Sequence, residues 1–155
     1  KNYPRYDMDN YLMIGSSAGG HLAAAFSLKN VGYKHYNLPK PKYLCLVYPV
    51  IDMSENAHTG SKNNILGINP SLEEMNKYSV QLNVDKDYPI TYLWQGDHDD
   101  TVPIINSKLM DEALTKNNVK HVYKIFEGIG HGWATCKYTN KDNWMNEMID
   151  YFEKE

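Results

Sequence analysis

This 155-residue chain has few cysteines, no excess of basic residues and no long apolar run, and each of these absences argues against a class of protein. There are two cysteines, Cys45 and Cys136, with no C-x-x-C pair and no zinc-type spacing, which argues against a metal or redox motif. Basic residues do not dominate, since 16 Lys and Arg stand against 19 Asp and Glu, and this balance argues against nucleic-acid binding. No apolar run approaches the roughly 20 residues that cross a bilayer, so we expect no membrane span.

The rest of the composition is that of an ordinary folded domain, with 42% hydrophobic and 23% charged residues. Short apolar segments at 11–14, 43–48, 90–94 and 121–126 predict strands. Helical patterns occupy 18–28, the segment after Pro103 and the segment from about 142. These alternating units predict a single α/β fold, with a mostly parallel sheet and helices on both faces. On the closing helix, helical spacing predicts burial of Met145, Met148, Ile149 and Phe152.

The stretch 51–79 is polar and irregular, and it contains Gly60, Gly67 and Pro70. Within it we expect a short helix at 72–77, with Ser71 as its N-cap and Glu74 in the capping-box position. The length of this stretch suits a functional loop better than a tight connection. We therefore expect 51–79 to form a cap or insertion over an active site.

The strongest local signal is the segment Gly15-Ser16-Ser17-Ala18-Gly19, which fits the pattern G-x-S-x-G. It lies directly between an apolar strand and an alanine-rich helix, the setting of a strained turn that exposes a nucleophilic serine. We expect Gly15 and Gly19 to make steric room where the strand and helix backbones approach each other. The amide of Ala18, at the helix N-terminus, would then face an oxyanion formed at Ser17.

A serine hydroxyl needs a base within hydrogen-bond reach, and six histidines compete for that role. His131 follows the last predicted strand and is flanked by Gly130 and Gly132, so we expect it at the carboxyl edge of the sheet. His21 follows the serine on the same helix, and its ring should point away from Ser17. The pattern favours His131 as the general base.

The acid that orients such a histidine should follow a strand between Ser17 and His131. The loop after the third predicted strand offers three carboxylates, Asp97, Asp99 and Asp100, and spacing does not choose among them. A metal site in this acidic loop is an alternative, but acidic turns are usually only solvated, and we expect no metal.

Four segments of the chain resemble the serine esterase branch of the α/β-hydrolases, near the carbohydrate acetyl-esterases and hormone-sensitive-lipase-like enzymes. The segments are GSSAGGHLAA at 15–24, YPVI at 48–51, QGDHDDTVP at 95–103 and GHG at 130–132. The resemblance covers nearly the whole chain, and the order Ser, Asp, His along the chain is the one found in these hydrolases. In such enzymes the acid is the aspartate of Asp-x-x-Val-Pro, so the resemblance selects Asp99.

The resemblance implies an acyl transfer in which Ser17 attacks an ester, His131 takes its proton and Asp99 orients His131. It implies a small ester as substrate, with a short acyl group such as acetyl on a carbohydrate, and no cofactor. Two alternatives stay open: a serine peptidase of the prolyl-oligopeptidase type, which shares Asp-x-x-Val-Pro, and a non-catalytic binding module on the same fold. The SAGGHLA run favours an esterase over the peptidase.

One feature departs from the resemblance. In these hydrolases the serine turn follows the fifth strand of an eight-stranded sheet, but here it begins at residue 15. The earlier strands, and the His-Gly-Gly loop that supplies further oxyanion amides, are not among the 155 residues. We therefore expect 1–155 to be the C-terminal portion of a single hydrolase domain that needs the N-terminal half for activity. Alone, the strand at 11–14 would be an apolar edge that invites association, including with a second copy.

Overall fold

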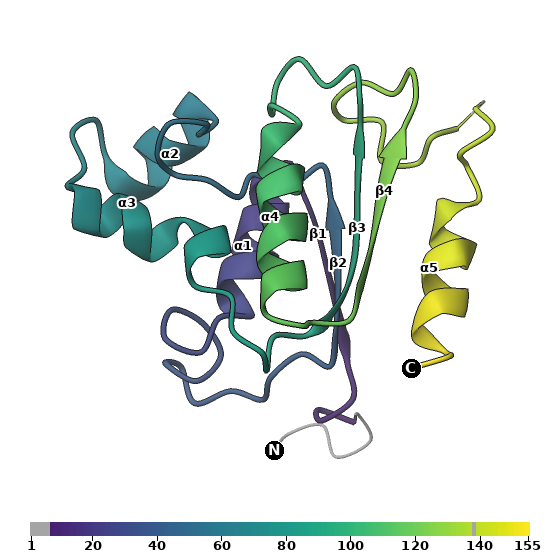
Figure 1. The fold of residues 1–155 in the computed structure, drawn as a ribbon, viewed down its shortest axis with the longest axis horizontal. Coiled ribbons are helices and arrows are strands. Elements are labelled where there is room, and N and C mark those ends of the chain that lie inside the picture. The colour runs from purple at the N-terminus through teal and green to yellow at the C-terminus, as the bar shows by residue number, and fades with distance from the viewer. Residues whose placement is uncertain (1–6, 138) are drawn as a thin grey trace.

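The computed structural model describes residues 7–137 and 139–155, and in them it contains one four-stranded sheet (Figure 1). Its strands are β1 (Leu12–Ser16), β2 (Tyr43–Val47), β3 (Ile90–Gly96) and β4 (His121–Phe126). All neighbouring strands are parallel, and their order in the sheet, β1-β2-β3-β4, is their order in the chain. The parallel α/β fold predicted from the sequence is confirmed.

The register brings the same end of every strand to the same edge. Leu12 pairs with Tyr43, Tyr43 pairs with Ile90, and Thr91 pairs with His121. The carboxyl ends of the strands consequently lie together, and the loops that leave them share one edge. In open α/β sheets, ligands bind in the crevice outside this edge.

Helices cover both faces of the sheet, as the sequence predicts. α1 (Ser17–Phe26) and α4 (Ile105–Lys116) lie on one face, and α5 (Trp144–Phe152) lies on the other (Figure 1). Strand side chains alternate between two buried clusters because successive residues of a strand point to opposite faces. Leu44, Leu46 and Leu93 belong to the cluster with α1 and α4. The cluster with α5 contains Cys45, Val47, Tyr92 and Trp94.

The prediction for α5 is right for two residues and wrong for two. Met148 and Phe152 are buried, but Met145 is 44% exposed and Ile149 is 47% exposed. The helix begins at Trp144, whose ring lies 5.3 Å from the ring of Trp94, between centroids. This aromatic contact sets the rotation of α5, so the stripe 144, 148 and 152 faces the sheet.

Segment 51–79 contains two short helices, α2 (Thr59–Leu66) and α3 (Leu72–Tyr78), followed by a 3₁₀ turn at Val80–Leu82. Both helices lie on the α1 side of the molecule, away from α5 (Figure 1). The capping box that Ser71 and Glu74 predict is present. α2 was not predicted, because its sequence TGSKNNIL has no apolar period. It is capped instead by His58, whose Nδ1 accepts a hydrogen bond from the amide of Ser61.

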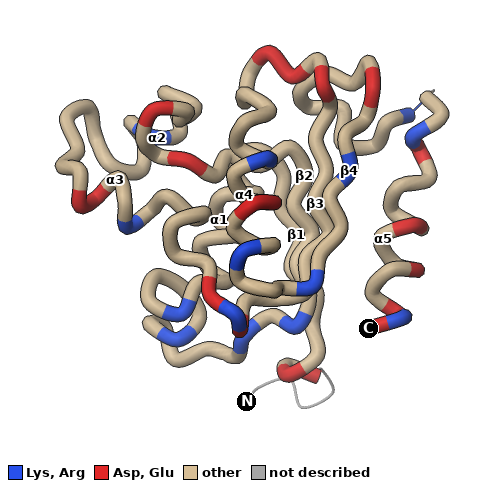
Figure 2. The backbone as a smooth tube through the Cα atoms, in the orientation of Figure 1, with Lys and Arg blue, Asp and Glu red and all other residues tan. Residues whose placement is uncertain are grey.

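Charged residues of both signs are interspersed over the surface, and the loops that follow β3 and β4 carry acidic residues (Figure 2). No helix in the described part of the chain has both the length and the apolar character needed to cross a membrane.

Candidate active site

The chain passes from β1 into α1 without an intervening loop, so Ser17 is the first residue of the helix. Its φ angle is +54°, in the left-handed region that non-glycine residues seldom adopt. A side chain on Gly15 could not fit, because its Cβ would lie 2.2 Å from the carbonyl oxygen of Gly19. This is the strand–turn–helix setting that the G-x-S-x-G pattern predicts, with a strained serine at the turn.

The steric role expected of Gly19 is carried by a different residue. A Cβ on Gly19 would meet no atom within 4 Å among the described residues, whereas one on Gly20 would lie 2.7 Å from Cβ of Pro49. The prediction of steric room at Gly15 holds, and the prediction at Gly19 is wrong. The reason is rotation along α1: position 20, not 19, points toward the chain that leaves β2.

Three of the predicted site residues form one hydrogen-bonded row. Ser17 Oγ lies 2.9 Å from His131 Nε2, and His131 Nδ1 lies 2.8 Å from Asp99 Oδ2. The side chain of Asp99 is fully buried and that of His131 is 16% exposed. A carboxylate is only an acceptor, so Nδ1 carries the proton and Nε2 is free to accept the serine proton. The row has the distances that a nucleophile, its base and an orienting acid require.

The carboxylate of Asp99 is itself held in place. Oδ1 accepts from the amides of Thr101 (3.0 Å) and Val102 (2.8 Å), and Oδ2 accepts from Gln95 Nε2 (3.0 Å). Gln95 is fully buried at the end of β3, and its own Oε1 accepts from Ser107 Oγ. Gln95 was not predicted as a site residue, although a polar residue inside an otherwise apolar strand is a signal for one.

The other two acidic residues of the loop support its shape. Asp97 Oδ1 accepts from the amide of Gly128 at 2.7 Å, which joins the loop after β3 to the loop after β4. Asp100 Oδ1 accepts from Thr101 Oγ1 at 3.2 Å. In the stretches 7–137 and 139–155, no three His, Cys, Asp or Glu side chains cluster as a metal ion would need.

Three other histidines have hydrogen-bond partners other than Ser17. His21 is buried, and its Nε2 donates to the carbonyl of Tyr78 at 2.9 Å. Burial lowers the pKa of His21, an effect that this hydrogen bond partly opposes. His121 lies 2.9 Å from Asp111, and His58 caps α2.

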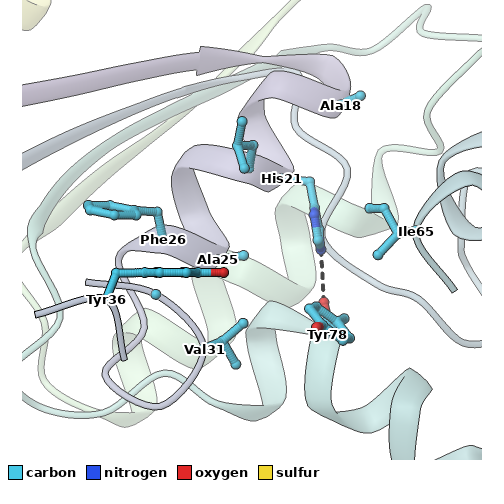
Figure 3. A pocket seen from close by; sticks show the side chains of 10 residues that line it. Ala18, His21, Ala25, Phe26, Val31, Tyr36, Ile65 and Tyr78 are labelled. Carbon is cyan, nitrogen blue, oxygen red and sulfur yellow. Dashed lines mark hydrogen bonds between the residues drawn. The ribbon is translucent and has the colours of Figure 1, made fainter. Parts of the chain in front are cut away.

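An apolar cavity of about 370 Å³ includes Ala18, the residue after Ser17, in its lining (Figure 3). One wall is a stripe of α1, formed by Ala18, His21, Leu22 and Ala25. The opposite walls include Tyr36 from the loop after α1, and Ile65 and Tyr78 from the segment 51–79. As the second residue of α1, Ala18 also has an N–H group with no acceptor one turn earlier in the helix.

All 155 residues match the prolyl oligopeptidase family. This chain belongs to that family. Its fold is the α/β-hydrolase fold, and the solved structures that resemble it include carboxylesterases and carbohydrate esterases. The resemblance to hydrolases drawn from the sequence is thereby confirmed.

One relative in sequence and two solved structures show how much of this chain, and how much of each relative, the similarity covers. The chain is 29% identical over 152 residues to endo-1,4-beta-xylanase B of Butyrivibrio fibrisolvens, covering 93% of this chain and 24% of the xylanase. It is 33% identical to an acetyl ester-xyloside bifunctional hydrolase from Caldicellulosiruptor lactoaceticus, with a TM-score of 0.81 over 91% of this chain and 55% of the other. A carboxylesterase from Lactobacillus plantarum shares the fold, at 23% identity and TM-score 0.79, over 96% of this chain and 59% of that structure. The chain therefore spans about a quarter of the xylanase and little more than half of the two solved hydrolases.

Proposed function

We propose that this chain carries the catalytic residues of a serine esterase that cleaves short-chain carboxylic esters. The observation that carries the proposal is the hydrogen-bonded row from Ser17 through His131 to Asp99 at the carboxyl edge of the sheet. The buried, four-times hydrogen-bonded carboxylate of Asp99 supports its role as the orienting acid.

The mechanism follows from which atoms carry protons. His131 Nε2 takes the proton of Ser17 as the serine oxygen attacks the ester carbonyl, and Asp99 stabilises the imidazolium that results. The N–H of Ala18 has no acceptor within the first turn of α1, and it stabilises the oxyanion. His131 then protonates the departing alcohol. Water, deprotonated by the same histidine, releases the acid and restores Ser17.

We also propose that the natural substrates are acetyl or other short acyl esters of carbohydrates. Support comes from relatives alone. One is named an acetyl ester-xyloside bifunctional hydrolase, and another is a xylanase, of whose length this chain covers about a quarter. The wall that 51–79 contributes to the cavity beside Ala18 supports a role for that segment in shaping the substrate pocket.

A prolyl-oligopeptidase-like peptidase is the second candidate, and the family match itself favours it. The two candidates differ in the bond they cleave. Comparing kcat/KM on short acyl esters with kcat/KM on peptide amides separates them, because an esterase should show turnover on the esters alone. A non-catalytic module would show neither activity.

We also propose that activity depends on a further part of the hydrolase fold, which these 155 residues do not contain. That part would supply a second oxyanion donor. Two observations support this part of the proposal. The chain spans 55% and 59% of the two solved hydrolases. In the described residues β1 is an edge strand; Ile14 within it is 55% exposed, and Leu22 of α1 is 71% exposed. Loss of one oxyanion donor typically lowers kcat by about 10²–10³.

The decisive experiment is labelling of the purified full-length protein with a fluorophosphonate, followed by intact mass and peptide mapping. We expect one adduct, on Ser17, and none in Ser17→Ala or His131→Ala. His121→Ala is the matched control, because His121 also pairs with an aspartate but lies at the start of β4. Unlabelled wild-type protein, or esterase activity that survives in Ser17→Ala, would refute the proposed mechanism.

A further inference from the structure

Tyr48 stands in the middle of the proposed site, although no step of the mechanism uses it. It is the first residue after β2, and β2 lies between β1 and β3. Tyr48 therefore lies at the carboxyl edge between Ser17, which follows β1, and Asp99, in the loop after β3. Its backbone N–H donates to the carbonyl of Trp94 at 2.8 Å, which fixes Tyr48 to the neighbouring strand.

The backbone of Tyr48 is strained. Its φ angle is +39°, which is rare for a bulky aromatic residue. The chain on its C-terminal side is held as well, since Pro49 packs against Gly20 and the amide of Val50 donates to the carbonyl of Ser17 at 3.1 Å. Strain of this kind persists only where the surroundings enforce it, and it collects at functional sites.

The Tyr48 ring packs against the imidazole of His131. The two ring centroids are 4.7 Å apart at an interplanar angle of 58°, and the other neighbour of the Tyr48 ring is Trp94, edge-on at 5.4 Å. Hydrogen bonds at Nδ1 and Nε2 restrain the imidazole, but hydrogen bonds tolerate some tilt of the ring plane. A buried aromatic ring against its side restricts that tilt.

The Tyr48 hydroxyl connects the two segments that carry the nucleophile and the base. Burial raises the pKa of Tyr48, and hydrogen bonds with the Ser16 side chain and the Ala134 backbone oppose this effect. Ser16 directly precedes Ser17, and Ala134 lies three residues after His131, beyond a glycine with φ of +81°. The side chain thus contacts the serine turn, the imidazole and the loop that carries the imidazole.

We propose that Tyr48 is a positioning residue, whose ring fixes the tilt of the His131 imidazole between Ser17 and Asp99. The proposal rests on the proposed function, because positioning matters only if the Ser17 row is catalytic. Small misplacements of reacting groups lower rates by factors on the order of 10². Tyr48 contacts His131 and does not line the apolar cavity beside Ala18, so its removal should lower kcat and leave KM nearly unchanged.

The test compares Tyr48→Leu, which removes the ring, with Tyr48→Phe, which removes only the hydroxyl. With a short-chain aryl ester and the full-length protein, we expect Tyr48→Leu to lower kcat by about 10- to 100-fold, with KM within about twofold. Tyr48→Phe should lose distinctly less, below about tenfold, because it keeps the ring. If Tyr48→Leu does not fold, Tyr48→Asn replaces it, since asparagine tolerates positive φ and also lacks the aromatic ring.

Tyr92→Leu is the matched control. Tyr92 is a buried tyrosine of the same sheet, in β3, and it belongs to the α5 side of the core, where its ring neighbours are Tyr151 and Phe152. We expect this variant to lose stability but to keep its kcat. A folded Tyr48→Leu with kcat within about twofold of wild type, equal losses in Leu and Phe, or the same loss in Tyr92→Leu would each overturn the proposal. Ser17→Ala, assayed alongside, distinguishes failure of the proposed function from failure of the positioning role. If Ser17→Ala keeps activity, the proposed function fails and the positioning role of Tyr48 fails with it.

Discussion

Asp52 provides a quantitative test of the structure through acid titration. Its carboxylate is 1% exposed, yet its hydrogen-bond partners are uncharged. Oδ1 accepts from the amide and hydroxyl of Ser54, from Ser79 Oγ and from Gln81 Nε2, while Oδ2 accepts from the amide and side chain of Asn56. These contacts tie the chain leaving β2 to the chain leaving α3. Asp52 thereby anchors both ends of the segment that holds α2 and α3.

The expected size of the effect follows from the pKa of Asp52. Burial alone raises this pKa, but the hydrogen bonds from Asn56, Ser54 and Gln81 outweigh burial, so the pKa falls from 3.8 to about 2. A carboxyl group with a lowered folded-state pKa stabilises the protein above its unfolded-state pKa, and this stabilisation is lost as pH falls through the folded-state value. This lowering of the pKa corresponds to about 2 kcal/mol of stability, and roughly 1 kcal/mol of it is already lost by about pH 3.

Urea unfolding of wild type and Asp52→Asn at several pH values between about 6 and 3 measures this contribution. Asparagine does not titrate, so any fixed cost of the substitution is the same at every pH. The difference in unfolding free energy between the two proteins should therefore shrink by roughly 1 kcal/mol on going to about pH 3. A difference that stays constant to within about 0.3 kcal/mol would show that Asp52 is not held as the structure describes.

Three further outcomes are expected. Gly15→Ala should destabilise the protein by more than about 3 kcal/mol in thermal unfolding, because the new Cβ would lie 2.2 Å from a backbone oxygen. Gly19→Ala, whose Cβ would meet no described atom within 4 Å, should change stability by less than about 1 kcal/mol. Asp99→Asn should lower kcat on the order of 10³–10⁴ by disturbing the histidine tautomer, and a loss below about tenfold in steady-state kinetics would contradict the assigned role. Burial raises the pKa of Cys45 to about 12 and also raises that of Cys136, so iodoacetamide at about pH 8 should modify neither cysteine until urea unfolds the protein.

The sheet was predictable because each strand is a short apolar run that ends at a turn residue. The fourth strand was placed at its observed bounds, His121–Phe126, and the third was placed two residues short at its C-terminal end. α2 escaped prediction because its polar sequence lacks a periodic face, and local capping by His58 replaces that signal. The rotation of α5 escaped because Met145 and Ile149 have the same apolar character as the residues that face the sheet.

Several features of the candidate site could not be predicted from spacing. Spacing left three aspartates equivalent; the resemblance selected Asp99, the aspartate that the structure brings to His131. Tyr48 was missed because its contacts with Trp94 and His131 depend on which strands are neighbours, which no local pattern reveals. The contacts of Gln95 with Asp99 and Ser107 are local in sequence, and its polar side chain inside an apolar strand was the signal for them. The steric role assigned to Gly19 was wrong for a related reason, since it depends on where Pro49 lies.

The order of the strands also determines when the site can first exist during synthesis. Each strand adds to the edge left by the previous one, so the sheet can grow in the direction in which the chain is made. Ser17 and His131 are 114 residues apart, which at about 5–20 residues per second is roughly 6–23 seconds of translation. In the proposed mechanism the serine has no base throughout that interval, so a nascent chain cannot form the acyl-enzyme. Under that mechanism, labelling of Ser17 would report that β4 has joined the sheet.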